Sequence, residues 1–274
     1  MREIRSQHLG PITTLALCLP LLLAVQCATT APTAVSTDDG QRVDRRAWDR
    51  LVARDPLAFL IACRDHYLET VTDYRCVFRK QERIDGAVQP EEHIRIRFRE
   101  CPYSVDMRWF KNTRRAARLT YVKGRWTTGD KELAHIQPSG VLGLLAPMGV
   151  KRDIHGPALA RESRRPVDQF GYRNTLERII GFCRQASEHP DYDLRFDTTT
   201  SFHGRPCYHL ERRLPYDGEP AGYPNRLLDI YIDREWLVPL GSLAYADDER
   251  ETLLGSYLLI EPEFNVGLSD DDFP

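Results

Sequence analysis

The residues whose chemistry best suits a metal ion are His203, Cys207 and His209. Odd-numbered positions of a hairpin share one face, and neutral imidazole with thiolate is a zinc-binding combination. Their spacing matches no closed zinc motif, so two interpretations stay open: a zinc site, or a turn histidine beside two half-buried strand residues. We therefore predict no metal and no other cofactor.

A second group that could do chemistry is the pair Lys80 and Glu82, which share one face of a predicted strand. They form either a functional pair or a cross-strand charge match. The acidic residues 270–272 lack the alternating oxygen ligands and the glycine of a calcium loop, which favours a solvated acidic end. Residues 255–257, Gly-Ser-Tyr, lack the second glycine of a nucleophile elbow, and the sequence has no phosphate-binding loop or dinucleotide fingerprint. No catalytic residue is assigned, and the protein is predicted not to be an enzyme.

The N-terminal segment is typical of an export signal. Arg2 and Arg5 precede an apolar run from Ile12 to Val25, and this run is shorter than the ~20 residues that a membrane-spanning helix needs. We predict a signal peptide over residues 1–27, a flexible tether over 28–43 and a single domain over 44–274, with export to the periplasm or cell envelope. Cys27 stands where a lipoprotein carries its acylated cysteine, but Gln26 replaces the small residue expected before it, which favours a soluble exported form over a lipid-anchored one.

The balance of charges bears on possible partners, and the number of cysteines bears on possible disulfides. The chain has 38 Lys and Arg against 40 Asp and Glu, so its net charge gives no reason to expect nucleic acid. Five of the seven cysteines lie beyond Cys27, an odd number for an oxidising compartment. Cys76 and Cys101 lie near the open end of one predicted hairpin and are the first candidates for a disulfide. The alternative is that all five are small buried hydrophobic residues.

Periodicity predicts two main helices and about ten strands. A helix over 56–71 follows the N-cap and first-turn pair Asp55-Pro56, and its predicted packing face is Leu57, Leu60, Ile61 and Leu68. A second helix starts at a capping-box pattern, Asn174 with Glu177, and ends near His189. Alternating apolar and polar residues predict the strands. They cover residues 73–84, 91–100, 103–110, 116–124, 131–136, 191–202, 206–214, 226–233, 236–246 and 252–261.

The second of these strands carries a basic stripe, His93, Arg95, Arg97 and Arg99. Strand parity places the intervening apolar residues on the opposite, buried face, because clustered cations are not buried without matching anions. The stripe is then either a solvated face, partly paired with acidic residues, or a contact for an anionic membrane surface or acidic partner.

Residues 137–171 are rich in Gly and Pro and follow no sustained period. A connection of this length inside a compact domain is usually a lid or a binding loop. Its apolar patch, residues 141–150, is interrupted by glycine, so it is either a mobile cover for the sheet or a fixed core plug.

The stretches YRCVFRKQERIDG, SVDMRW, YVKG and NVGLSDDDF together resemble an uncharacterised family of bacterial exported proteins, the domain of unknown function family 1571, from about Leu51 to Phe273. IYIDREWLVPLGSLAYAD is similar to a strand-turn-strand of the periplasmic lipoprotein carriers LolA and LolB. The carrier resemblance implies an incomplete β-barrel, open on one side, with helices in or over its concavity. Neither resemblance implies a catalytic residue.

The resulting prediction is an α+β, LolA-like fold: a strongly curved antiparallel sheet, an incomplete β-barrel of about ten strands, with two main helices and a long lid loop. The predicted function is binding or carrying a lipid, an acyl group or a lipoprotein. The candidate ligand-binding residues are Phe78, Ile94, Ile96, Phe98, Leu142, Leu144, Leu145 and Met148. Two alternatives stay open, a metal-dependent or hydrolytic envelope enzyme and a structural envelope protein without a ligand. The oligomeric state is not assigned.

Overall fold

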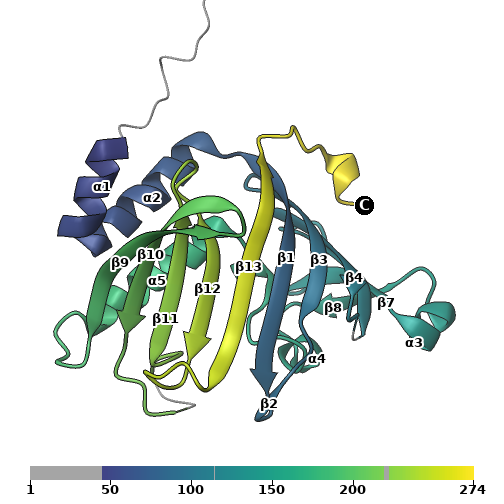
Figure 1. Cartoon of the computed structure of the whole chain (residues 1–274). Coiled ribbons are helices and arrows are strands. Elements are labelled where there is room, and N and C mark those ends of the chain that lie inside the picture. The colour runs from purple at the N-terminus through teal and green to yellow at the C-terminus, as the bar shows by residue number, and fades with distance from the viewer. Residues whose placement is uncertain (1–44, 114, 219–221) are drawn as a thin grey trace, which may run out of the picture. The chain divides into compact units, whose positions relative to one another are not determined.

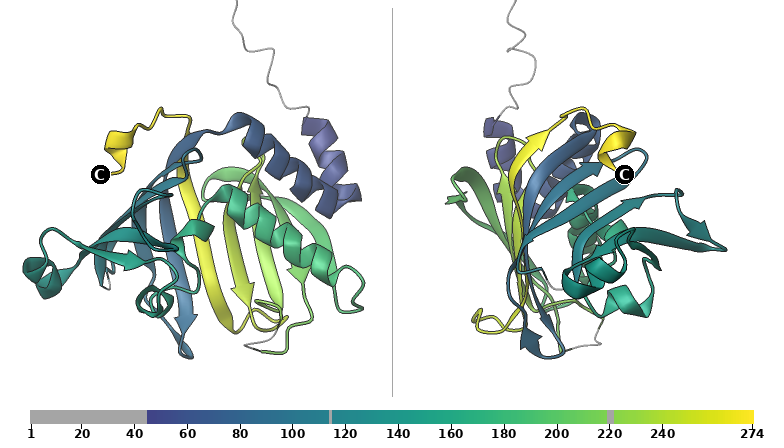
Figure 2. Two further views of the ribbon diagram at one scale, coloured as in Figure 1. Left: turned by 180° about the vertical axis from the view of Figure 1, so that it is seen from behind. Right: turned by 90° about the vertical axis from the view of Figure 1, so that its right-hand side faces the viewer.

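A computed structural model describes residues 45–113, 115–218 and 222–274 (Figure 1). The predicted signal peptide and tether, and the acylation candidate Cys27, lie outside these residues. Within them, thirteen strands form one antiparallel sheet that curves strongly without closing (Figures 1 and 2). Two long helices, α2 (Pro56–Thr70) and α5 (Tyr172–Ala186), accompany it. The predicted fold class is confirmed. None of the described helices combines the length and the apolar character that crossing a membrane requires.

The strand order is β6-β7-β5-β4-β3-β1-β13-β12-β11-β10-β9, with β2 beside β1 and β8 beside β7. The strands are β1 (Asp73–Ile84), β2 (Ala87–Val88), β3 (Glu92–Arg99), β4 (Ser104–Lys111), β5 (Ala116–Val122), β6 (Thr127–Thr128), β7 (Lys131–Pro138), β8 (Val150–Asp153), β9 (Asp193–Phe202), β10 (Arg205–Arg213), β11 (Leu227–Asp233), β12 (Pro239–Tyr245) and β13 (Leu253–Phe264). The helices are α1 (Arg45–Arg54), α2 (Pro56–Thr70), α3 (Gly140–Leu145), α4 (Pro157–Ala160) and α5 (Tyr172–Ala186), with short 3-10 turns η1 (Val167–Gln169) and η2 (Asp270–Asp272).

Helix α2 begins where the sequence predicts it. The Asp55 carboxylate accepts a hydrogen bond of 2.9 Å from the Ala58 backbone N–H, and a proline in the first turn loses no helical hydrogen bond. Leu60 is fully buried among residues of α5 and the sheet, but Leu68 is 48% exposed. Its predicted place in the packing face is wrong, because α2 carries apolar residues nearly all round and their spacing alone does not identify the buried side.

Helix α5 starts two residues before the predicted position, at Tyr172. Asn174 does not cap it. Its side-chain N–H₂ donates instead to the backbone carbonyls of Asp168 (3.0 Å) and Phe170 (2.9 Å), which ties the preceding segment to the first turn. The buried face of α5 includes Leu176, Ile179, Ile180 and Cys183, which recur at helical spacing.

Strand parity in β3 is confirmed. Ile94, Ile96 and Phe98 are 1–2% exposed, while the basic residues alternate with them on the other face. Part of the basic stripe is paired with the acidic end of the chain: Arg97 Nη1 lies 3.2 Å from Asp272 Oδ1, and Arg99 Nη2 lies 2.6 Å from Asp270 Oδ1. These contacts favour the interpretation of the stripe as a paired, solvated face.

Two large hydrophobic cores pack against the sheet, beside a small cluster of Val122, Leu268 and Phe273. Helices α1, α2 and α5 bury one core against β9 to β12, and Figure 2 shows α5 running across these strands. The other core fills the curve formed by β1, β3, β4, β5 and β7. Ile154, Val167 and Tyr172 belong to this second core, so only the later part of the predicted lid, residues 154–171, covers the sheet.

Candidate functional site

The residues predicted to bind a ligand fall into two groups that the structure keeps apart. Phe78, Ile94, Ile96 and Phe98 lie together on the inner face of β1 and β3, where they are 1–7% exposed. The Phe170 ring covers them, with its centroid 5.2 Å from that of Phe78 and 6.1 Å from that of Phe98. This concave face is therefore filled by the protein's own side chains.

The second group lies at the far end of the hairpin formed by β7 and β8. Three of its side chains are exposed, Leu144 (82%), Leu145 (77%) and Met148 (86%). Together with the neighbouring Val141, which was not predicted and is 72% exposed, they form what we call the apolar tip. The Leu142 side chain lies outside the described set. These residues do not form the expected cover, because the antiparallel pairing of Ile136 with Val150 directs the connection beyond the strand ends and away from the concave face. Gly149, at φ 72°, lets the chain turn back into β8. A residue with a Cβ would not fit there, because that atom would lie 2.8 Å from the Ile136 carbonyl oxygen.

Lys80 lies in a buried ionic cluster on the same inner face. It pairs across the strands with Glu92, and its Nζ lies 3.5 Å from Glu92 Oε2 and 3.4 Å from Glu82 Oε2. The Tyr257 hydroxyl donates to Glu82 (2.8 Å), and Trp109 Nε1 donates to Glu92 (2.6 Å). Lys80, Glu82 and Glu92 are 2–8% exposed, so the cluster joins β1, β3, β4 and β13 as a buried cross-strand match.

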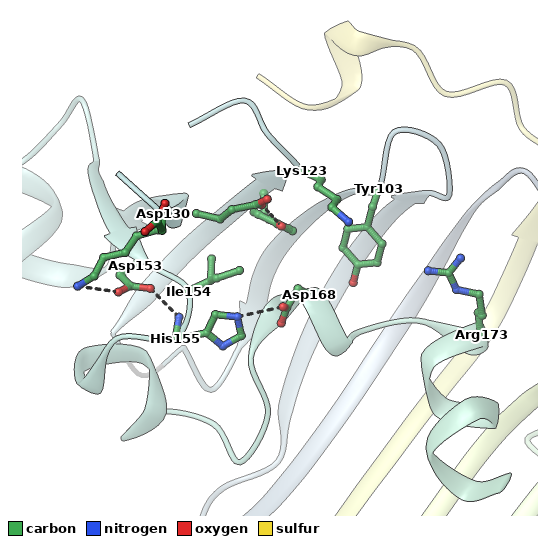
Figure 3. A pocket seen from close by; sticks show the side chains of 11 residues that line it. Tyr103, Lys123, Asp130, Asp153, Ile154, His155, Asp168 and Arg173 are labelled. Atoms are coloured by element: carbon green, nitrogen blue, oxygen red, sulfur yellow. Dashed lines mark hydrogen bonds and ion pairs between the residues drawn. The ribbon is translucent and has the colours of Figure 1, made fainter. Parts of the chain in front are cut away.

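A cavity of about 600 Å³ opens at the edge of the concave face (Figure 3). Strands β5 and β7 form one wall, and the segment leading into α5 forms the other. The lining side chains are Tyr103, Tyr121, Lys123, Asp130, Lys131, Glu132, Asp153, Ile154, His155, Asp168 and Arg173. None of these was predicted, because they come from five separate stretches of the chain and no local spacing joins them.

The cavity is polar and mostly paired within itself. His155 Nε2 lies 3.1 Å from Asp168 Oδ2, Lys131 Nζ lies 3.3 Å from Asp153 Oδ2, and the Tyr121 hydroxyl donates to Glu132. The second oxygen of Asp168, Oδ1, is buried and has no hydrogen-bond partner in the described chain. A bound group with a hydrogen-bond donor would satisfy it. Because charged and hydrogen-bonding side chains line the cavity, it is suited to holding a polar group.

The metal candidates do not come together. His203 occupies a turn with φ 46°, whereas His209 lies between carboxylates. In the described part of the chain, the ligand atoms within 4.8 Å of one another belong to His209, Glu211 and Asp229. Arg250 already supplies their positive charge, with Nη2 2.8 Å from Asp229 Oδ1 and a further bond to Glu211. The group is therefore a satisfied ionic network.

This network predicts a pH-dependent stability. Burial lowers the pKa of His209, but its hydrogen bonds with Asp229 (3.1 Å) and Asp197 (3.0 Å) outweigh that effect and raise the pKa above its ordinary value. The stability that a raised histidine pKa contributes is fully present below the pKa of the unfolded state, about 6.5. It is lost as the pH rises through the pKa of the folded state. We expect His209→Gln to lower Tm more at about pH 5.5 than at about pH 8.5. The exposed His203, changed to Asn, is the control, and equal losses for His209→Gln at the two pH values would contradict the assignment.

The predicted disulfide is absent. Cys63, Cys76, Cys101, Cys183 and Cys207 are free thiols, and only Cys101 among them is exposed. Cys76 is paired with Ile96 in the sheet, and Cys101 follows five residues later. Ile96 lies three residues before the end of β3, and Cys101 lies in the turn beyond that end. At ~3.3 Å per strand residue, those three residues alone span roughly 10 Å, which exceeds the ~7 Å limit for a disulfide between Cα atoms.

The family is decided by the match of residues 71–274 to a profile described as protein of unknown function, DUF1571. The chain belongs to the DUF1571 family. No curated protein matches the chain by sequence.

Solved structures are similar to this DUF1571 chain at low identity. The Pseudomonas aeruginosa MucA/MucB complex matches at 14% identity and TM-score 0.45, covering 80% of this chain and 60% of the matched one. Mycobacterium tuberculosis lipoprotein LppX matches at 11% identity and TM-score 0.40, and the match covers 78% of this chain and 98% of LppX. A LolA superfamily protein from Nitrosomonas europaea matches at 8% identity and TM-score 0.24, and the match covers 78% of this chain and 97% of that protein. The chain spans about three fifths of the MucB chain it matches.

Proposed function

We propose that the protein is a non-enzymatic, exported binding protein that takes up an amphipathic molecule, a lipid or an acyl-bearing component, at a membrane of the cell envelope. The observation that carries this proposal is the apolar tip. Among the described side chains, the other large hydrophobic ones that are strongly exposed are Leu68, Val88 and Phe110; they are 41–48% exposed and lie on separate elements. A cluster of four such side chains at 72–86% exposure is costly in water and marks an interaction surface.

The charge beside the tip favours a membrane surface as its partner. Lys151 and Arg152 follow the tip directly in β8, and both are exposed. Neither forms an ion pair with a carboxylate in the described chain; Lys151 Nζ lies 5.5 Å from the Trp126 ring centroid. Basic residues next to inserted apolar side chains bind anionic head groups, with about 1 kcal/mol from each.

The concave face offers room for the apolar part of a ligand only if its cover is displaced. That cover, residues 154–171, contains only the short helix α4 and the turn η1, while the surface beneath it is aromatic and aliphatic. The polar cavity at its edge, with the unpartnered Asp168 oxygen, would receive the head group. Irregular covers of this kind commonly open to admit ligands.

A structural envelope protein without a ligand is the second candidate. It is favoured by the filling of the concave face, in which Phe78, Phe98 and Phe170 pack against one another. Membrane binding through the tip, followed by uptake of lipid, separates the two candidates.

The first step is tested by vesicle flotation. Wild-type protein is expected to float with vesicles of phosphatidylcholine and phosphatidylglycerol. The double variant Leu144→Gln/Leu145→Gln is expected to bind roughly a hundredfold more weakly, since losing insertion of two leucines costs about 3 kcal/mol. Leu68→Gln changes an exposed leucine on α2 and is the matched control. Equal binding by the double variant and wild type would contradict the proposal.

A further inference from the structure

The basic side chains of the polar cavity are mostly neutralised by neighbouring carboxylates (Figure 3). Lys131 Nζ lies 3.3 Å from Asp153 Oδ2, and Arg173 Nη1 lies 3.5 Å from Glu100 Oε2. Lys123 is exposed and forms no ion pair within the described ranges. The Lys and Arg side chains of the wall therefore leave one positive charge without a counter-charge.

The acidic side chains of the cavity leave more charge unpaired. Among the described residues, no Lys or Arg forms an ion pair with three carboxylates of the wall, those of Asp130, Glu132 and Asp168. Glu132 accepts a hydrogen bond from a tyrosine hydroxyl, and Asp168 Oδ2 lies 3.1 Å from Nε2 of His155. Even with His155 protonated, these carboxylates outnumber the unpaired cations. The excess of negative charge favours a cationic ligand.

Asp168 has hydrogen-bonding capacity to spare. Its side chain is 31% exposed, and Oδ1 has no hydrogen-bond partner in the described chain. Rotation of the carboxylate exchanges its two oxygens, so a donor in the cavity has access to the capacity that His155 leaves unused. Figure 3 shows Asp168 between His155 and Tyr103. The Tyr103 hydroxyl lies 2.8 Å from the carbonyl oxygen of Val167 and 2.9 Å from that of Phe170, which fixes the backbone on both sides of Asp168.

The other surroundings of Asp168 suit an ammonium group better than a metal ion. The rings of Tyr103 and Tyr121 line the same cavity, with centroids 5.8 Å apart, and an ammonium placed over such rings is attracted by their electron-rich faces. A metal ion needs several ligand atoms close together. Within the described ranges, three such atoms lie within 4.8 Å of one another at His209 and its neighbours, not in this cavity.

We propose that the polar cavity binds an ammonium group that carries N–H donors, with the Asp168 carboxylate as its main partner. A primary ammonium supplies both the positive charge and the hydrogen bond that the free oxygen lacks. A quaternary ammonium carries the same charge but has no N–H, so it leaves that oxygen unsatisfied. The inference rests on the proposed function only for the source of the ammonium: the ethanolamine head group of a lipid in that case, a soluble amine otherwise.

The site is tested with two head groups that lack acyl chains and differ only in three methyl groups on the nitrogen, glycerophosphoethanolamine and glycerophosphocholine. Each is titrated into wild-type protein, and binding is followed by NMR through the ring signals of His155. Glycerophosphoethanolamine is expected to bind about fivefold more tightly or better, because only it donates a hydrogen bond to the carboxylate. This comparison needs no substitution, so it does not depend on the folding of a variant.

Three variants assign the site to Asp168. Asp168→Asn is expected to weaken glycerophosphoethanolamine binding about tenfold or more, because it removes the negative charge and keeps the shape. Lys123→Gln is expected to bind it equally or more tightly, since a cation leaves the wall, whereas a site for an anion would lose affinity. Asp191→Asn, an exposed aspartate between α5 and β9, is the matched control and is expected to bind as wild type does.

The source is distinguished with vesicles that hold equal amounts of phosphatidylethanolamine and phosphatidylcholine with the same acyl chains. Preferential recovery of phosphatidylethanolamine with wild type, lost in Asp168→Asn, identifies a lipid head group. Glycerophosphoethanolamine binding without such a preference identifies a soluble amine; if no lipid is recovered at all, the lipid-binding function fails while the ammonium site stands. The site is overturned if both soluble head groups bind wild type equally or neither binds, and lipid recovered in that case leaves the proposed function standing alone.

Discussion

Replacing Lys80 with Met is expected to lower the free energy of unfolding by about 3 to 5 kcal/mol, because it strands two buried carboxylates. Glu82 and Glu92 are 2% and 5% exposed, and Lys80 lies within 3.5 Å of both. Methionine keeps most of the volume, so the loss reports charge rather than a cavity. Urea denaturation at neutral pH measures it.

Two variants control this prediction. The triple change Lys80→Met/Glu82→Gln/Glu92→Gln removes every charge of the cluster and is expected to recover most of the loss. Arg64→Met breaks a pair with Asp65 at the surface and is expected to cost below about 1 kcal/mol. A Lys80→Met loss as small as that of Arg64→Met would show that the cluster is hydrated and open to solvent.

The second large effect is expected at Leu60. This side chain of α2 is fully buried against α5 and the sheet. Leu60→Ala is therefore expected to lower the free energy of unfolding by about 2 to 5 kcal/mol. Leu68→Ala, two turns along the same helix and 48% exposed, is expected to cost about 0.5 kcal/mol or less. The difference appears in the urea midpoint with little change in the m-value. Similar losses for the two variants would contradict the packing of α2.

The strands and their faces could be predicted because the information is local. In β3, alternation alone placed Ile94, Ile96 and Phe98 inside and the arginines outside, since parity fixes both faces at once. The same rule placed Lys80 and Glu82 on one face. That they are buried could not be predicted, because their charge is balanced by Glu92 on another strand.

The apolar tip was assigned to the wrong place for a physical reason. Leucines such as Leu144 and Leu145 are normally buried, so the sequence favours a cover over the sheet. Their position depends instead on the pairing of β7 with β8, and a four-residue strand such as β8 gives a weak signal in a Gly-rich and Pro-rich stretch. An apolar run that is exposed in the fold is best explained by a partner, which connects this error to the proposed function.

The polar cavity had no local signal at all. His155 and Asp168 lie thirteen residues apart in an irregular segment. Such sites arise only from tertiary packing, so spacing along the chain does not reveal them.

The proposed function requires that the protein remove an amphipathic molecule from a membrane. Lipid-free protein is incubated with vesicles of phosphatidylcholine and phosphatidylglycerol, separated from them by gel filtration and extracted for lipid analysis. Wild type is expected to leave the vesicles with about one lipid per chain, because a ligand pocket of ordinary size has room for few such molecules. The Leu144→Gln/Leu145→Gln variant is expected to leave with far less lipid. Wild-type protein that binds the vesicles and yet returns free of lipid would contradict the account.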